Sequence, residues 1–144
     1  MSLTAFSGPV GTFTQQSDGV NHSDLGLTEM TQVVTLNQNS TTAVTAVVYL
    51  PQNSSIVDII ADTLTQWDSA TSATLSAGTA AAGTQYVSGV NAKTAGRQTP
   101  SYTSAQLTAM ANIGANVGVF ITVTVVGATT AGITRVTVRY IQNQ

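Results

Sequence analysis

The sequence has no cysteine among its 144 residues. Disulfide bonds, thiolate metal ligands and a cysteine nucleophile are therefore excluded, and the redox compartment leaves no signal. Histidine is almost as scarce, because His22 is the only one and stands beside a single carboxylate, Asp24. A zinc site takes about three or four ligands, so we interpret His22 as a surface or interface polar residue.

Charged side chains make up only 7% of the sequence, against roughly a quarter in an ordinary soluble domain, although the hydrophobic fraction of 42% is close to normal. Thr, Ser, Gln, Asn, Ala and Gly take the place of the missing charge. A free monomer usually keeps a heavily charged surface, whereas the core of an interface is depleted in Lys, Glu and Asp. We therefore expect much of this surface to contact other protein. An extracellular β domain with a Thr-rich face is the alternative that composition leaves open.

Positive charge and long hydrophobic runs are both lacking. Four Lys and Arg with a net charge of −2 cannot neutralise a run of phosphates, so nucleic acid is not an expected partner. No run approaches the ~20 apolar residues of a membrane span, and the first nine residues lack the pattern of a secretory signal. We expect neither a membrane partner nor export by the signal-peptide route.

The groups needed for catalysis are thinly spread. Asp58 and Asp62 are the closest pair of carboxylates on one predicted strand, and about 13 Å separates them, which is too far for a catalytic dyad. A calcium site would need more oxygen ligands than this pair supplies. No nucleophile elbow, phosphate-binding loop or dinucleotide fingerprint occurs. We expect a protein that is not an enzyme, with no cofactor, no metal and no small-molecule substrate.

The chain divides into an arm, residues 1–30, and a β domain, residues 31–144. The arm is rich in Gly, Ser, Thr and Gln and has no sustained period of 2 or 3.6. Its spaced apolar residues, among them Phe6, Val10 and Phe13, are predicted anchors. Two alternatives stay open: the arm docks on a neighbouring subunit, or it wraps its own domain.

Short β-branched runs predict about seven or eight strands, and therefore an all-β fold, an antiparallel β-sandwich of jelly-roll type. A polar cluster at 37–40 indicates a hairpin or a corner, and residues 89–100 have loop composition. In the strand 56–64, Val57, Ile59 and Ala61 are predicted on one face and the two aspartates on the other, wetter face. The strongest strand patterns lie at 117–125 and 133–141, which we expect to form a long hairpin.

One short helix is expected. Thr103 followed three residues later by Gln106 is a capping-box pattern, and Leu107, Met110 and Ala111 continue at helical spacing. The helix should end near Gly114.

The candidate interface residues are aromatic or basic, except for the aliphatic Val10 of the arm. Aromatic residues of this domain are either core or interface anchors, or else a sugar-stacking platform, which we consider the weaker interpretation. Basic residues are expected to pair with carboxylates of a neighbouring subunit or to remain solvated. The full candidate set is Phe6, Val10, Phe13, Trp67, Tyr86, Lys93, Arg97, Tyr102, Arg135 and Arg139.

A resemblance is carried by the runs Val47–Pro51, Ser55–Ile59 and Thr71–Thr79, with Tyr86, and by the closing Val136–Tyr140. Across roughly residues 44 to 141, their order and composition resemble the small virion proteins of tailed bacteriophages that act as head decoration, or cement, proteins. The resemblance implies trimers on the capsid surface, bound to the major capsid protein, in a virion assembled in the host cytoplasm. It transfers no functional residue, and the arm lies outside it.

Three other functions are weighed against this one. A tail-tube, neck or fibre-base protein belongs to the same structural class. A carbohydrate-binding module or adhesin would use Trp67 and Tyr102 at its sugar site. A hydrolase has the weakest support, because acid, base and nucleophile cannot be assembled from the residues present.

Overall fold

The computed structural model describes residues 28–39 and 42–142. The predicted anchors Phe6, Val10 and Phe13, and almost all of the arm, lie outside the described residues. The described part forms mostly β-structure with one short helix, and its first strand begins at Glu29, slightly before the predicted boundary at residue 31. The elements are β1 (Glu29–Asn37), β2 (Ala43–Tyr49), β3 (Ser54–Thr65), β4 (Ser72–Gly78), β5 (Val87–Asn91), β6 (Gly96–Gln98), α1 (Ser104–Ala111), β7 (Gly118–Val126) and β8 (Ile133–Gln142).

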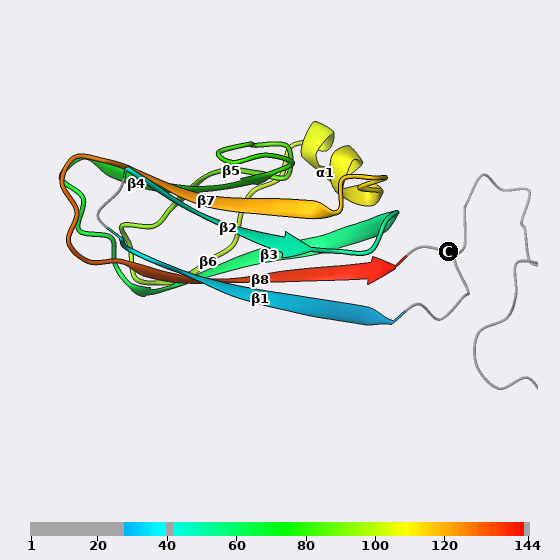
Figure 1. Ribbon diagram of the computed structural model, residues 1–144, viewed down its shortest axis with the longest axis horizontal. Helices are drawn as coiled ribbons and strands as arrows, with labels where there is room; N and C mark the ends of the chain where they lie inside the picture. The colour runs from blue at the N-terminus through cyan, green and yellow to red at the C-terminus, as the bar shows by residue number, and fades with distance from the viewer. Residues whose placement is uncertain (1–27, 40–41, 143–144) are drawn as a thin grey trace, which may run out of the picture.

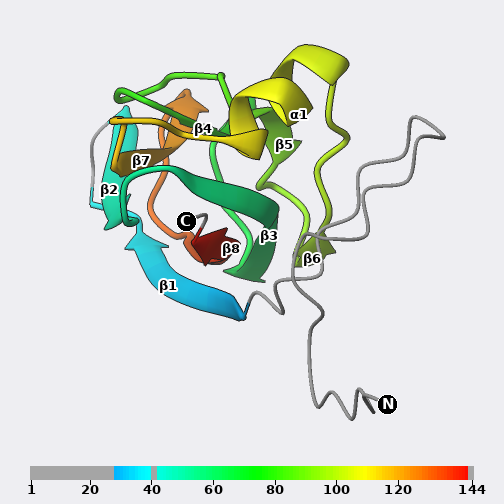
Figure 2. The same ribbon diagram turned by 90° about the vertical axis from the view of Figure 1, so that its right-hand side faces the viewer.

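The strands form two four-stranded antiparallel sheets that lie in two layers (Figures 1 and 2). The strand order is β1-β8-β3-β6 in one sheet and β2-β7-β4-β5 in the other. The predicted hairpin of 117–125 with 133–141 is wrong: both strands form, but β7 and β8 belong to different sheets. The alternating pattern predicts which side of a strand is buried, but it does not predict which strand is its neighbour in the sheet. Residues 37–40 were predicted as a hairpin or a corner. They lie between β1 and β2, which belong to different sheets, so the corner is the correct alternative.

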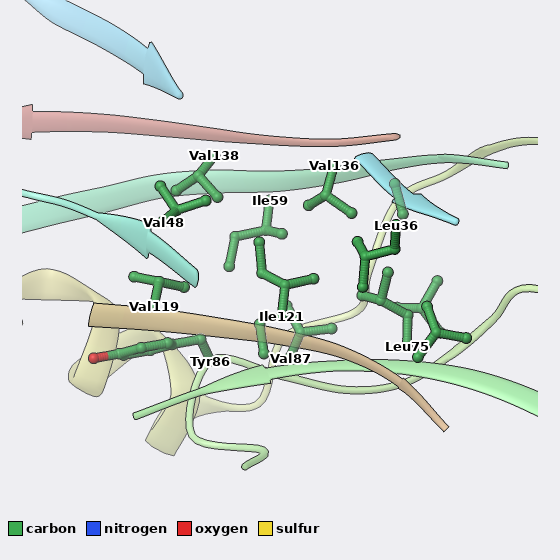
Figure 3. Packing of buried hydrophobic residues seen from close by; sticks show 14 of the residues in the cluster. Leu36, Val48, Ile59, Leu75, Tyr86, Val87, Val119, Ile121, Val136 and Val138 are labelled. Atoms are coloured by element: carbon green, nitrogen blue, oxygen red, sulfur yellow. The ribbon is translucent and has the colours of Figure 1, made fainter. Parts of the chain in front are cut away.

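The inward rows of both sheets make one hydrophobic core (Figure 3). On β7, Val119, Ile121 and Val123 are fully buried. On β8, Val136 and Val138 face Val119 and Ile121 from the other sheet. Burial of a Val or Ile side chain contributes about 1.5–3 kcal/mol, so these alternating residues are the main source of stability. The prediction that Thr134, Val136, Val138 and Tyr140 share one side of the last strand is confirmed, because all four are buried.

Trp67 and Tyr86 belong to the core, so their assignment as interface residues is wrong. The indole of Trp67 lies over Gly132, where a Cβ atom would overlap the ring. Its Nε1 donates a hydrogen bond of 2.9 Å to Thr134 Oγ1, which satisfies the buried polar group. With both rings inside, Trp67 and Tyr86 are not exposed for a sugar-stacking platform, which was the weaker of the two interpretations.

A β-bulge changes the predicted faces of β3. The register against β8 shifts between Ile56 and Asp58, so Ile56 points inward and Val57 is 43% exposed. Val57 was predicted to share a face with Ile59 and Ala61, and one extra residue in the strand reverses its orientation. Beyond the bulge the predicted alternation holds for Ile59 and Ala61, which are buried.

The segment predicted as a loop, residues 89–100, contains the end of β5 and the whole of β6. Both strands include a glycine with positive φ, Gly89 and Gly96, and this composition hides the strands from pattern analysis. The predicted helix is confirmed with its capping box: Thr103 Oγ1 accepts from the Gln106 backbone, and Gln106 Oε1 accepts from the Thr103 backbone. Within residues 28–39 and 42–142, no helix is both long and apolar enough to cross a membrane.

Candidate interface on the outer sheet faces

The outer face of the β1-β8-β3-β6 sheet collects most of the charge, and we call it the charged face. The sequence has ten charged residues; Asp18 and Asp24 lie outside the described part, which leaves eight. Six of these eight lie on the charged face, three acidic and three basic, so their charges balance. They are Glu29, Asp58, Asp62, Arg97, Arg135 and Arg139.

Asp62 joins three strands of this face. It lies on β3 directly opposite Arg97 of β6 and Arg135 of β8. Arg97 donates from Nε to Oδ1 at 2.6 Å and from Nη2 to Oδ2 at 3.0 Å, and Arg135 Nη2 donates to Oδ2 at 2.9 Å. The two guanidinium groups, Arg97 foremost, hold the pKa of Asp62 well below its usual range against the opposing effect of burial. Asp62 is therefore ionised at neutral pH although it is only 6% exposed.

A second group of contacts lies farther along the same face. Arg139 donates from Nε to Glu29 of β1, and its Nη1 lies 3.9 Å from Asp58 of β3. The Tyr102 hydroxyl donates to Asp58 Oδ1 at 2.7 Å and accepts from the Ile59 backbone N–H at 2.9 Å. Burial, and then the bond to Asp58, raise the pKa of Tyr102. Tyr102 thus binds the edge of β3 beyond the short strand β6.

The basic candidates therefore serve the fold of their own chain. Arg97, Arg135 and Arg139 were predicted to pair with a neighbouring subunit or to stay solvated, and instead each pairs with a carboxylate of the same chain. Sequence spacing could not show this, because the carboxylates come from strands far away in the chain. Lys93, between β5 and β6, is partly exposed and makes no ion pair with the carboxylates of the described residues.

Asp68 is likewise used internally. Its carboxylate accepts hydrogen bonds from the hydroxyls of Thr129 and Thr130 and from the backbone N–H groups of Thr130 and Ala131. These donors, the Thr130 hydroxyl first, hold the pKa of Asp68 well below its usual range. The contact ties the β7–β8 connection to the segment that follows β3.

The outer face of the β2-β7-β4-β5 sheet differs sharply, and we call its part on β2, β7 and β4 the neutral face. The outward residues of these three strands, all of them described, include no charged side chain. Threonine is the commonest, and the hydroxyls of Thr45 and Thr122 are hydrogen-bonded at 2.9 Å across β2 and β7. The neutral face consists of Ala43, Thr45, Val47, Tyr49, Ser72, Thr74, Ser76, Gly78, Gly118, Phe120, Thr122, Thr124 and Val126.

An uncharged turn, residues 79–85, covers part of the neutral face. The Ala82 backbone N–H donates to Thr122 Oγ1 at 2.9 Å, and Gln85 Oε1 accepts from the Thr79 backbone at 3.2 Å. Ala82 has a positive φ of 59°, a conformation that a non-glycine residue adopts at some energetic cost. The turn therefore lies over Thr122, which is buried although it is on the outer side of β7.

At the opposite side of the neutral face three apolar side chains meet over Gly118, and we call Val47, Tyr49 and Phe120 the Gly118 cluster. A Cβ atom on Gly118 would lie 3.2 Å from Phe120 Cε2, 3.5 Å from Val47 Cγ1 and 3.7 Å from Tyr49 Cε1. Tyr49 is 70% exposed, and the other two are partly buried. The sequence analysis missed this cluster, although strict alternation from the buried Val48 would have placed Tyr49 outward.

Two surface hollows among the described residues have simple linings. One of about 260 Å³ lies beside Gln38, Thr65 and Ile133, and one of about 330 Å³ lies beside Thr84, Ser88 and Gln106; both have uncharged linings. Gln106 Nε2 already donates to Thr84 O and Ser88 Oγ. Over the described ranges, no three His, Cys, Asp or Glu side chains gather where they could hold a metal ion.

Comparison of the chain with protein-family models, with curated proteins and with solved structures finds no match. The functional assignment therefore depends on the two outer faces and on their charge.

Proposed function

We propose that the two sheets form a β-sandwich of jelly-roll type. In a jelly roll, one long antiparallel hairpin of eight strands is rolled up, so the first strand pairs with the last, the second with the seventh, and so on inward. The pairs β1–β8, β2–β7, β3–β6 and β4–β5 support this topology. Viral capsid domains and lectins both use this architecture, so it favours a structural or binding role without choosing between them.

We propose that the protein is a non-enzymatic structural protein of a phage virion, a decoration protein that binds the major capsid protein as a homo-oligomer, with a trimer favoured. The observation that carries the proposal is the neutral face, a broad sheet surface without a charged side chain among its described residues. Interface cores are depleted in charge in the same way. The pairing of the arginines with carboxylates of their own chain supports it further, since no large field of one sign remains on the charged face to repel a neighbour.

The proposed mechanism is additive burial. Each copy would cover apolar area on its neighbours and on the capsid, at roughly 25 cal/mol per Å² before the costs of association are subtracted. Many copies on one shell act as a multivalent clamp, so modest contacts together resist internal pressure. A closed ring of copies also covers edge strands that would otherwise template aggregation.

The test is the mass of the purified full chain in solution, followed by sedimentation with phage heads that lack their decoration protein. We expect an oligomer, favouring a trimer, that co-sediments with heads and is absent from the pellet without them. Binding to purified tails but not to heads would move the protein to the tail, neck or fibre base. A monomer that binds neither particle would overturn the proposal.

A further inference from the structure

The Gly118 cluster is the part of the neutral face most suited to hold an apolar side chain. Val47 and Tyr49 come from β2, an edge strand, and Phe120 from the neighbouring β7. Tyr49 leaves 70% of its surface in solvent. A tyrosine that is exposed next to other apolar groups, with no charge around it, is a typical anchor of a protein interface.

The chain itself supplies a segment of matching chemistry. Residues 1–17 contain no charged or histidine side chain, and their aromatic residues are Phe6 and Phe13, with Val10 between them. An uncharged segment avoids the large cost of burying an unpaired charge when it docks on another surface. The first acidic residue, Asp18, follows this segment and can stay in solvent.

The position of β1 places the start of the arm at the end of the domain that carries the Gly118 cluster. β1 begins at the end of the domain where β2 ends and β7 begins (Figure 1), so the arm starts near the end that carries the Gly118 cluster. Thr28 lies fifteen positions after Phe13, and such a segment can span about 50 Å when extended. A domain of this size has a radius of gyration of about 13 Å, so an adjacent copy lies within reach.

We propose that the Gly118 cluster of one copy binds the segment Phe6–Phe13 of a second copy. This inference rests on the proposed function and deepens it, because it names the contact that joins the copies. An arm bound to a different surface on the next molecule is a heterologous contact, and heterologous contacts that close produce rings. Docking on a second copy also brings the remaining neutral face of both molecules together at high effective concentration, whereas docking on the same copy would cover the cluster alone.

Because the sequence has no cysteine, only the introduced thiols can form a disulfide bond in a cross-linking test. In the full chain, Tyr49→Cys combined with Phe13→Cys places one thiol in the cluster and one in the arm, and mild oxidation should join different copies. We expect covalent oligomers on a denaturing, non-reducing gel, up to the number of copies in the native oligomer. The matched control is Thr31→Cys combined with Phe13→Cys, because Thr31 is exposed on the charged face, and it should remain mainly monomeric.

A second measurement uses single substitutions. Tyr49→Ser and Phe13→Ser should each weaken the oligomer by tenfold or more in dissociation constant, and the double variant should lose little beyond either single one. Leu107→Ser, which alters an exposed apolar residue of α1, is the control and should leave the mass unchanged. Far-ultraviolet circular dichroism confirms that each variant is folded.

The outcomes separate the two proposals. A cross-linked product of monomer mass would place the arm on its own copy and overturn the inference. An intact oligomer that forms no more Tyr49→Cys product than the control would also overturn it, while leaving the decoration function standing. A monomeric wild-type chain that binds no particle would remove both proposals.

Discussion

Asp62 is the residue on which the charged face depends. Its carboxylate accepts three hydrogen bonds from two arginines of different strands and is 6% exposed, whereas the side chains of Arg97 and Arg135 are 63% and 46% exposed. A buried carboxylate without its partners would pay a desolvation cost, which the two guanidinium groups offset with opposite charge and hydrogen bonds. Because the guanidinium groups are exposed, solvent screens part of this attraction. The aspartate was visible in the sequence, but its partners were not, because 35 and 73 residues separate it from them.

Asp62→Asn should therefore lower the free energy of unfolding by about 1–2 kcal/mol at neutral pH. The measurement is denaturant unfolding of the wild type, Asp62→Asn, Arg97→Ala and the double variant. The two single losses should not add, because they remove the same contact. Additive losses would show that Asp62 and Arg97 do not interact in solution.

The same residue predicts a pH dependence with a defined sign. The pKa of Asp62 is lower in the folded state than the ~3.9 of an unfolded chain, so its stabilisation is complete above about pH 5 and is lost as pH falls through the folded pKa. The gap in unfolding free energy between wild type and Asp62→Asn should narrow between about pH 5 and pH 2. A gap that stays constant over that range would contradict the ionised carboxylate.

At the scale of elements, sequence patterns predicted the features that depend on residues close together in the chain. The capping box of Thr103 and Gln106 and the inward row of β8 were correct, because a cap involves residues three positions apart and a strand face repeats every second residue. β6 was missed and the hairpin of β7 with β8 was wrong, since both depend on which distant strand is the partner. β6 is a strand only because Arg97 and its neighbours pair with β3.

Thr103→Ala should lower stability by about 1 kcal/mol through loss of the hydrogen bond to the Gln106 backbone. Thr103→Ser keeps a hydroxyl at the cap and is the matched control, with a loss of a few tenths of a kcal/mol at most. Thermal unfolding followed by circular dichroism measures both. Equal losses in the two variants would mean that the cap hydroxyl does not contribute.

At the scale of the whole molecule, the two sheets divide the surface by charge. On the charged face, the arginines pair with carboxylates of the same chain. The neutral face presents threonine, serine and the Gly118 cluster. The sequence predicted an interface from the overall scarcity of charge. Five of the described residues on which it placed that interface belong instead to the core or to the ion pairs, namely Trp67, Tyr86, Arg97, Arg135 and Arg139. Composition could not show which residues lie together on the neutral face, because the strand order decides which residues share a face.

This division predicts different results for one added charge on each face. Thr74→Lys puts an ammonium group on the exposed neutral face, and Thr31→Lys puts the same group on the exposed charged face. An unpaired charge buried in an interface costs several kcal/mol, so Thr74→Lys should shift the oligomer strongly toward monomer while Thr31→Lys does not. Analytical ultracentrifugation compares the masses of the two variants in solution. Equal masses would exclude the neutral face from the interface.

The sequence by itself determined the β class, the buried side of most strands, the capped helix and the scarcity of charge. These features follow from composition and from contacts a few residues apart, where the chain leaves little freedom. Only the tertiary structure decided the pairing of β1 with β8 and β2 with β7, the burial of Trp67, and the neutral face. Each of these features depends on contacts between residues far apart in the chain. The free energy of those contacts depends on how both sheets pack together.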